Sequence, residues 1–240
     1  MSVWSCLGKI AARVGRGAAS CVTTIVEAAR TVVEGDPALR RRVAFSVAMI
    51  ALSAKMAKAD GVVTPDETRV FHQIFSVPPA EARNVARLYN LARGDVAGFE
   101  AYAQRMATLC REAGDGDGAL LEDVLDGLFH IAKADGLLHE LEGSFLRRVA
   151  DIFGVEEAAY RALLARHVDL GEKDPWAVLG VARGTPPAQV RRHYRQLVMA
   201  NHPDRAIARG LPEEFVAIAT RRLAAINAAF EAVERELAAA

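Results

Sequence analysis

A histidine and an aspartate lie two positions apart in the tripeptide His202-Pro203-Asp204, and both side chains can take part in proton transfer. Such a pair supports nucleophilic catalysis only with a nucleophile and oxyanion donors, and the sequence has no G-x-S-x-G motif or other paired nucleophile. Pro203 stiffens the backbone between the two polar side chains, which suits their presentation to a partner. The tripeptide is therefore a turn, a catalytic pair or a docking signal, and its surroundings must decide.

The segment before the tripeptide is basic. It carries Arg191, Arg192 and Arg195, with no acidic residue over residues 187–201, and Arg205 continues the charge beyond the tripeptide. On a helix, Arg191 and Arg195 share one face because they are four positions apart. A solvated face is the ordinary interpretation of such a run. The alternative is docking on an acidic protein surface. A nucleic acid is disfavoured, because the run lacks interleaved aromatic residues and the whole chain has a net charge of zero.

Two helices must position these side chains. Apolar residues at helical spacing predict one helix from about Pro187 to Asn201 and another from Pro212 to near Ala238. Joined by a loop, the two form an antiparallel hairpin with the tripeptide at its open end and not in a cleft. The apolar stripes comprise Val190, Tyr194, Leu197 and Val198 on the first helix and Phe215, Ile218, Leu223, Ile226, Phe230 and Val233 on the second.

A short helix is expected before this hairpin. Asp174 is suited to cap its start and Gly180 to end it, and Thr185-Pro186 reads as the cap and first residue of the next helix. The polar segment 168–173, which contains Gly and Lys, separates these elements from the preceding part of the chain and is the expected linker.

The ordered segments DPWAVLGV, RRHYRQLVMA, HPDR and INAAFEAV resemble the J domain of DnaJ-like co-chaperones, which are not themselves enzymes. The resemblance covers roughly residues 172–240 and places the J domain at 174–240. It implies that His202, Pro203 and Asp204 stimulate ATP hydrolysis by a DnaK-type chaperone. The positions implied to support docking are Arg191, Tyr194, Arg195 and Arg205. Two departures from the family are Gln196, where a second basic residue is frequent, and Trp176, where Tyr is usual.

An internal repeat marks the earlier part of the chain. MAKADGVVTPDE (56–67) and IAKADGLLHELE (131–142) share AKADG at an offset of 75 residues, which predicts a duplicated helix–turn–helix unit. These turns resemble TerB-like sequences over residues 38–167, and the order of the two domains resembles the DjlA-like co-chaperones. Unlike typical members of that branch, this sequence has no expected membrane-spanning segment. It also lacks the Gly/Phe-rich segment and the zinc repeats of general DnaJ chaperones.

Four acidic residues occupy matching places in the two turns. By resemblance to TerB-like domains, Asp60, Glu67, Asp135 and Glu142 are candidate oxygen ligands for calcium or magnesium. The competing interpretation is that Asp60 and Asp135 close helices while Glu67 and Glu142 cap the next ones. No cofactor is required on either interpretation.

The composition favours an all-α protein, and the two resemblances imply a TerB-like helical bundle followed by a J-domain hairpin. Half of the chain is apolar (52%), aromatic residues are few (6%), and helical periodicity recurs without strand-like alternation. Residues 1–37 are expected to form an amphipathic helical segment, because basic residues interrupt every apolar run before it reaches spanning length. Cys6, Cys21 and Cys110 form no C-x-x-C pair, which indicates neither a disulfide framework nor a zinc site. We therefore expect a cytoplasmic protein, with association at the membrane periphery left open.

The leading hypothesis is a co-chaperone that docks on a DnaK-type chaperone through the tripeptide and the basic helix. The alternative is a metal-responsive TerB-like stress module that uses the J domain as an adaptor. Homodimerisation through the TerB-like domain is a further expectation, and the sequence does not identify client proteins.

Overall fold

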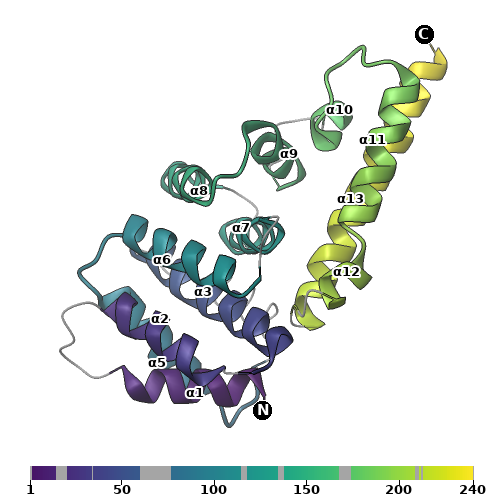
Figure 1. Cartoon of the computed structure of the whole chain (residues 1–240). Helices are drawn as coiled ribbons and strands as arrows, with labels where there is room; N and C mark the ends of the chain where they lie inside the picture. Colours follow the sequence, from purple (N-terminus) through teal and green to yellow (C-terminus); the bar gives the residue numbers. More distant parts are fainter. Residues whose placement is uncertain are drawn as a thin grey trace. The chain divides into compact units, whose positions relative to one another are not determined.

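The computed structural model describes residues 2–14, 21–33, 35–59, 77–114, 118–134, 138–167, 174–208, 211 and 213–239. These residues form helices with no β-strand among them, so the predicted all-α class is confirmed (Figure 1). Contacts divide the chain into a first unit of residues 1–155 and 209–211 and a second unit of residues 156–208 and 212–240.

The first unit is arranged around α3, a helix that packs against α1, α5, α6, α7 and α8. Side chains are buried on every side of α3 from Val43 to Ala57, as expected for an interior helix. The described helices of this unit are α1 (Val3–Arg13), α2 (Cys21–Val32), α3 (Pro37–Ala59), α5 (Ala82–Gly94), α6 (Phe99–Glu112), α7 (Ala119–Ala132) and α8 (Glu140–Phe153).

The amphipathic start of the chain is part of this core. Helix α1 buries Cys6, Leu7, Ile10 and Ala11 and packs against α2, α3 and α5. Its basic residues therefore do not mark a detached segment, because its apolar face is already covered. Within the described residues, every helix falls short of the length or the apolarity needed to span a bilayer.

A buried lysine fixes the loop between α5 and α6. The Lys55 ammonium donates to the carbonyl oxygens of Asp95 (3.0 Å) and Ala97 (2.7 Å) and lies 4.3 Å from the centroid of the Tyr102 ring. The exposed Lys58 also donates to the Asp95 carbonyl (2.9 Å). Burial raises the pKa of Asp95, but the hydrogen bond from the Tyr102 hydroxyl (2.8 Å) and other favourable contacts outweigh it, so the net pKa is lowered. Lysines on α3 thus hold a turn about 40 residues away in sequence.

After the second KADG turn, Glu142 takes the capping role that was one of its two interpretations. Helix α8 begins after His139, and the Glu142 carboxylate accepts the His139 backbone N–H at 3.0 Å. Glu142 is almost fully buried. Residues 60–67 of the first copy and Asp135 of the second lie outside the described residues. The duplication therefore stays a prediction.

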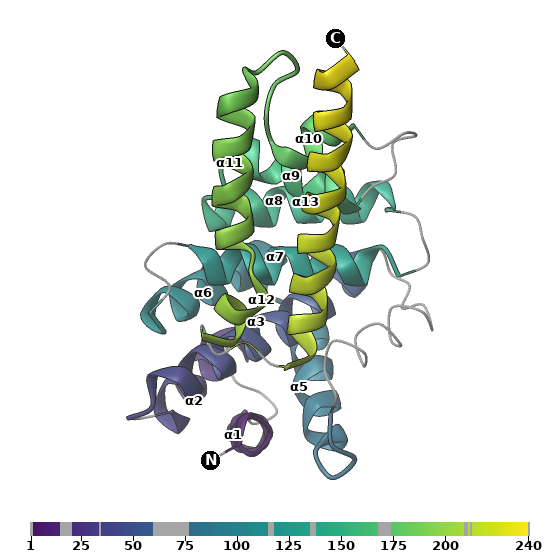
Figure 2. The same cartoon turned by 90° about the vertical axis from the view of Figure 1, so that its right-hand side faces the viewer.

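The second unit comprises α9 (Glu157–His167), α10 (Pro175–Leu179), α11 (Pro187–Ala200), α12 (Pro203–Ala208) and α13 (Glu213–Ala239). Helices α11 and α13 run antiparallel side by side, as the apolar stripes predict (Figures 1 and 2). The buried core of this unit contains Trp176, Val178, Leu179, Val190, Ile226, Ala229 and Val233.

Helix α9 packs against α10 and is grouped with it by contacts. A Cβ on Gly180 would lie 3.5 Å from the Cβ of Ala162, so the two helices approach closely. By contacts the chain divides between Val155 and Glu156, whereas the linker expected at residues 168–173 lies outside the described residues and stays a prediction.

Caps around α10 agree with the sequence, but the next cap does not. The Asp174 carboxylate accepts the Trp176 N–H at 3.2 Å, and Gly180 ends α10 in the left-handed region at φ 70°. The predicted cap at Thr185 is wrong, because α11 begins one residue later, at Pro187. The Thr185 hydroxyl instead donates to the Ala182 carbonyl at 2.7 Å.

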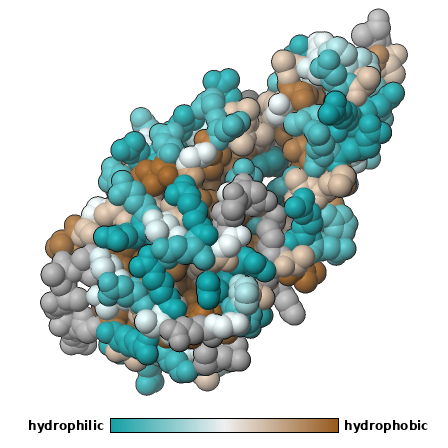
Figure 3. All heavy atoms as spheres, in the orientation of Figure 1, coloured by the Kyte–Doolittle hydropathy of each residue, from teal (hydrophilic) through white to brown (hydrophobic). Residues whose placement is uncertain are grey.

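Polar residues dominate the face drawn in Figure 3, where hydrophobic residues form small separate areas. The large hydrophobic residues exposed in the described part of the chain are Val96, Leu141, Met199 and Ile207.

Candidate functional site

The tripeptide lies where α11 gives way to the short helix α12. Pro203 is the first residue of α12, where a missing N–H costs no helical hydrogen bond. The His202 Nδ1 accepts the backbone N–H of Asp204 at 3.2 Å, so the imidazole covers the start of α12. This contact uses one ring nitrogen of His202, and no hydrogen bond of the other ring nitrogen occurs among the described residues.

The two polar side chains face solvent. The exposed side-chain fractions are 48% for His202 and 82% for Asp204, and His202 Nδ1 lies 3.5 Å from Asp204 Oδ2. This is too long for a strong hydrogen bond, and neither side chain is sheltered as a catalytic acid or base usually is. The geometry fits presentation to a partner better than proton transfer within the chain. The tripeptide is only partly a loop, since Pro203 and Asp204 belong to α12.

Asn201 ties this end of the hairpin to α13. Its side-chain amide donates to the Leu197 carbonyl at 2.8 Å, and its oxygen accepts from the Arg222 guanidinium at 3.1 Å. Arg222 also lies 5.8 Å from the centroid of the Phe215 ring. These contacts fix the residue directly before His202. Sequence analysis missed both positioning residues; an Asn after a helix signals an end cap, but no local pattern identifies Arg222 as its partner.

Tyr194 serves the packing of the hairpin. Its ring stacks on Phe230, with centroids 3.8 Å apart and an interplanar angle of 5°, and its hydroxyl donates to Asn227 at 3.0 Å. The side chain is half-buried. Tyr194 thus sets the distance between α11 and α13 beside the basic residues.

The arginines of α11 differ in their partners. Arg191 Nε lies 2.9 Å from the Glu234 carboxylate of α13. Arg192, Arg195 and Arg205 are exposed, and among the described residues none of the three makes an ion pair. Although residues 187–201 contain no acidic residue, α13 brings Glu234 to Arg191.

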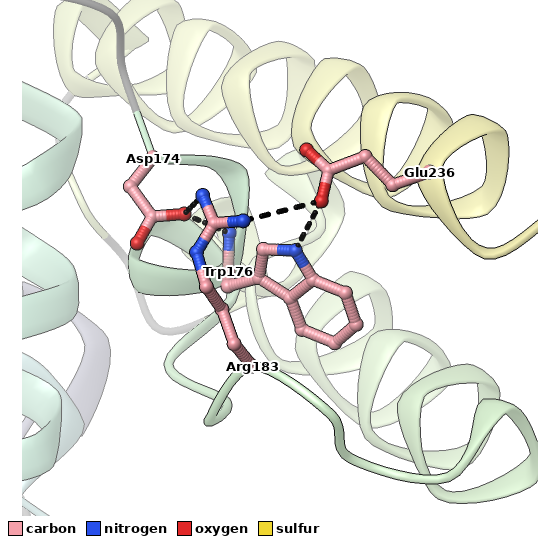
Figure 4. Close-up of polar contacts among 4 residues, drawn as sticks. All are labelled: Asp174, Trp176, Arg183 and Glu236. Atoms are coloured by element: carbon pink, nitrogen blue, oxygen red, sulfur yellow. Dashed lines mark hydrogen bonds and ion pairs between the residues drawn. The ribbon is translucent and has the colours of Figure 1, made fainter. Parts of the chain in front are cut away.

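A polar cluster joins α10 to the end of α13, as Figure 4 shows. The Trp176 indole N–H donates to the Glu236 carboxylate at 2.7 Å. Arg183 bridges Glu236 (3.4 Å) and Asp174 (3.0 Å). The cluster holds the first residues of α10 against α13. It therefore orients α10, which contributes side chains to the core that it shares with α11 and α13.

We expect Glu236→Ala to lower the free energy of unfolding of the second unit by about 1–3 kcal/mol, because the partly buried Trp176 N–H loses its acceptor. Arg183→Ala is the control and should cost no more than about 1 kcal/mol, since its ion pairs are exposed. Denaturant unfolding followed by tryptophan fluorescence measures both. Equal losses would show that the indole hydrogen bond contributes nothing beyond the ion pairs.

Of the four candidate metal ligands, only Glu142 lies within the described residues, and its carboxylate serves as a helix cap. Asp60, Glu67 and Asp135 lie outside them, so their convergence stays a prediction. In the part of the chain that the structure describes, His, Cys, Asp and Glu side chains do not gather in groups of three or more that would suit a metal ion.

This chain matches one family model and is similar to several known proteins. The family model described as "Tellurite resistance protein TerB" matches residues 46–165, half of the sequence. A "Co-chaperone protein DjlA" of Photobacterium profundum is 29% identical over 220 residues, which cover 82% of this chain and 79% of that protein. The DjlA of Shewanella oneidensis is 27% identical over 213 residues (83% and 80%), and that of Coxiella burnetii 26% over 201 residues (75% and 73%). No solved structure shows significant similarity.

Proposed function

Because this chain belongs to the TerB family and is similar to DjlA co-chaperones over most of its length, we propose that it acts as a co-chaperone of a DnaK-type chaperone. It regulates ATP hydrolysis by that partner. The docking activity belongs to residues 174–240, and His202, Pro203 and Asp204 are the residues that trigger hydrolysis.

The observation that carries this proposal is the ordered but exposed tripeptide. A docking signal must keep one conformation without a partner, because each residue ordered only on binding costs affinity. Asn201 and Arg222 fix its start, and the His202–Asp204 hydrogen bond fixes the turn itself. Both polar side chains remain available on the outside.

Electrostatic attraction supplies the second part of the proposal. Arg195 and Arg205 lie on either side of the tripeptide in sequence, and neither is neutralised by an acid among the described residues. Exposed charges of this kind mainly raise the association rate with an acidic surface. Tyr194 contributes indirectly, by holding α11 on α13.

The test is single-turnover ATP hydrolysis by a DnaK-type chaperone with and without the full chain. We expect faster hydrolysis with the chain, and a stimulation that declines as the screening length falls from about 10 Å at 0.1 M salt to about 3 Å at 1 M. Arg195→Ala with Arg205→Ala should slow association several-fold and weaken the salt dependence.

A control with the same change in net charge is Arg161→Ala with Arg235→Ala, which removes one arginine of α9, paired with Glu157, and one near the other end of α13. It should bind like the parent protein at every salt concentration. An unchanged hydrolysis rate with the parent chain would refute the proposed function. Equal slowing by the two double variants would refute only the role of Arg195 and Arg205.

A further inference from the structure

Among the described residues, Glu234 forms an ion pair with one arginine of α11, Arg191. The Arg191–Glu234 pair joins α11 to α13 at 2.9 Å, with side chains exposed to 63% and 42%. Arg192 and Arg195 have no such partner among the described residues. The three arginines of α11 are therefore not equivalent toward an approaching acidic surface.

The position of the pair is set by the hairpin. Arg191 lies three residues before Tyr194, and Glu234 lies four residues after Phe230, so the ion pair is one turn from the stacked rings. The rings keep α11 and α13 together whether or not the ion pair forms. Loss of the ion pair therefore frees the Arg191 guanidinium without dismantling the hairpin.

We propose that Glu234 is an intramolecular competitor that restrains docking. To bind an acidic group of the partner, Arg191 must first give up Glu234, and the unpaired Glu234 would then repel that group. The pair is exposed, so it can exchange partners readily. An exposed ion pair corresponds to about two- to fivefold in an equilibrium constant, and this is the extent to which Glu234 weakens docking. This inference rests on the proposed function and concerns the same surface.

Glu231 provides a matched control. It lies on the exposed side of α13 three residues before Glu234, and no ion pair of its side chain occurs among the described residues. Glu231→Gln and Glu234→Gln change the net charge by the same amount. Only Glu234→Gln releases Arg191, so a difference between the variants isolates the competition from the general charge effect.

The experiment measures association and dissociation rates of the full-length parent, Glu231→Gln and Glu234→Gln proteins on a DnaK-type chaperone at low salt. Glu234→Gln should bind about two- to fivefold more tightly than Glu231→Gln. Adding Arg191→Ala should remove this gain, and circular-dichroism melts should show that the hairpin remains folded in each variant. Equal affinities of the two Gln variants, or a gain that survives Arg191→Ala, would overturn this inference alone. A parent chain that does not bind would overturn the proposed function together with it.

Discussion

Replacing His202 with Gln is expected to abolish the stimulation of a DnaK-type ATPase while leaving the protein folded. The side chain is about half exposed, and its one described hydrogen bond supports the short helix α12 and not the core. The stability change should therefore stay within about 1 kcal/mol, as for the loss of a helix cap. Stimulation should fall to the rate of the chaperone alone, because the free imidazole nitrogen offered to the partner is gone. Single-turnover hydrolysis and thermal melting measure the two effects.

His139 offers the control for this substitution. It also precedes a helix, but it lies in the first unit, before α8. His139→Gln should keep full stimulation. A folded His202→Gln protein that stimulates as well as His139→Gln would show that the tripeptide is an ordinary turn.

Replacing the buried Lys55 with Met should lower the free energy of unfolding of the first unit. The substitution removes the donor to the Asp95 and Ala97 carbonyls while keeping a side chain of similar length. Burying the ammonium costs free energy, but removing it leaves the carbonyl oxygens that it contacts without a donor. Because the Ala97 carbonyl loses the donor that Lys55 supplied, we expect a loss of about 1–3 kcal/mol in the free energy of unfolding.

Lys58→Met is the matched control, because Lys58 binds the same Asp95 carbonyl from an exposed position. It should cost less than about 1 kcal/mol. Urea unfolding of the two variants at pH 7 measures the difference. Equal losses would indicate that burial of Lys55 has no energetic consequence for the α5–α6 loop.

The pH dependence provides a second measurement on the same variant. Burial, together with the nearby charge of Lys58, lowers the pKa of Lys55 below its ordinary value of 10.5. Between the folded and unfolded pKa values the unfolded chain binds the proton more tightly, so the contribution of Lys55 to stability rises with pH in that window. The parent protein should therefore gain stability relative to Lys55→Met as pH rises toward 10.5.

Local sequence determined the elements that carry the candidate site. The apolar stripes predicted α11 and α13 to within one or two residues, and the caps at Asp174 and Gly180 are where their residue types required them. Each of these features depends on neighbours within about four positions, so it can be predicted from the local sequence. The tripeptide could be located for the same reason, as the break between two periodic segments.

Pairing across the hairpin was decided only by tertiary structure. Arg191 and Glu234 are 43 residues apart, and α11 itself contains no acidic residue. Which arginine meets an acid depends on the rotation and register of α13 against α11, and these follow from how the buried side chains of both helices fit together. The same physical cause explains why Arg222 reaches Asn201 and why Lys55 reaches a loop 40 residues away, since packing brings together groups whose separation along the chain carries no local signal.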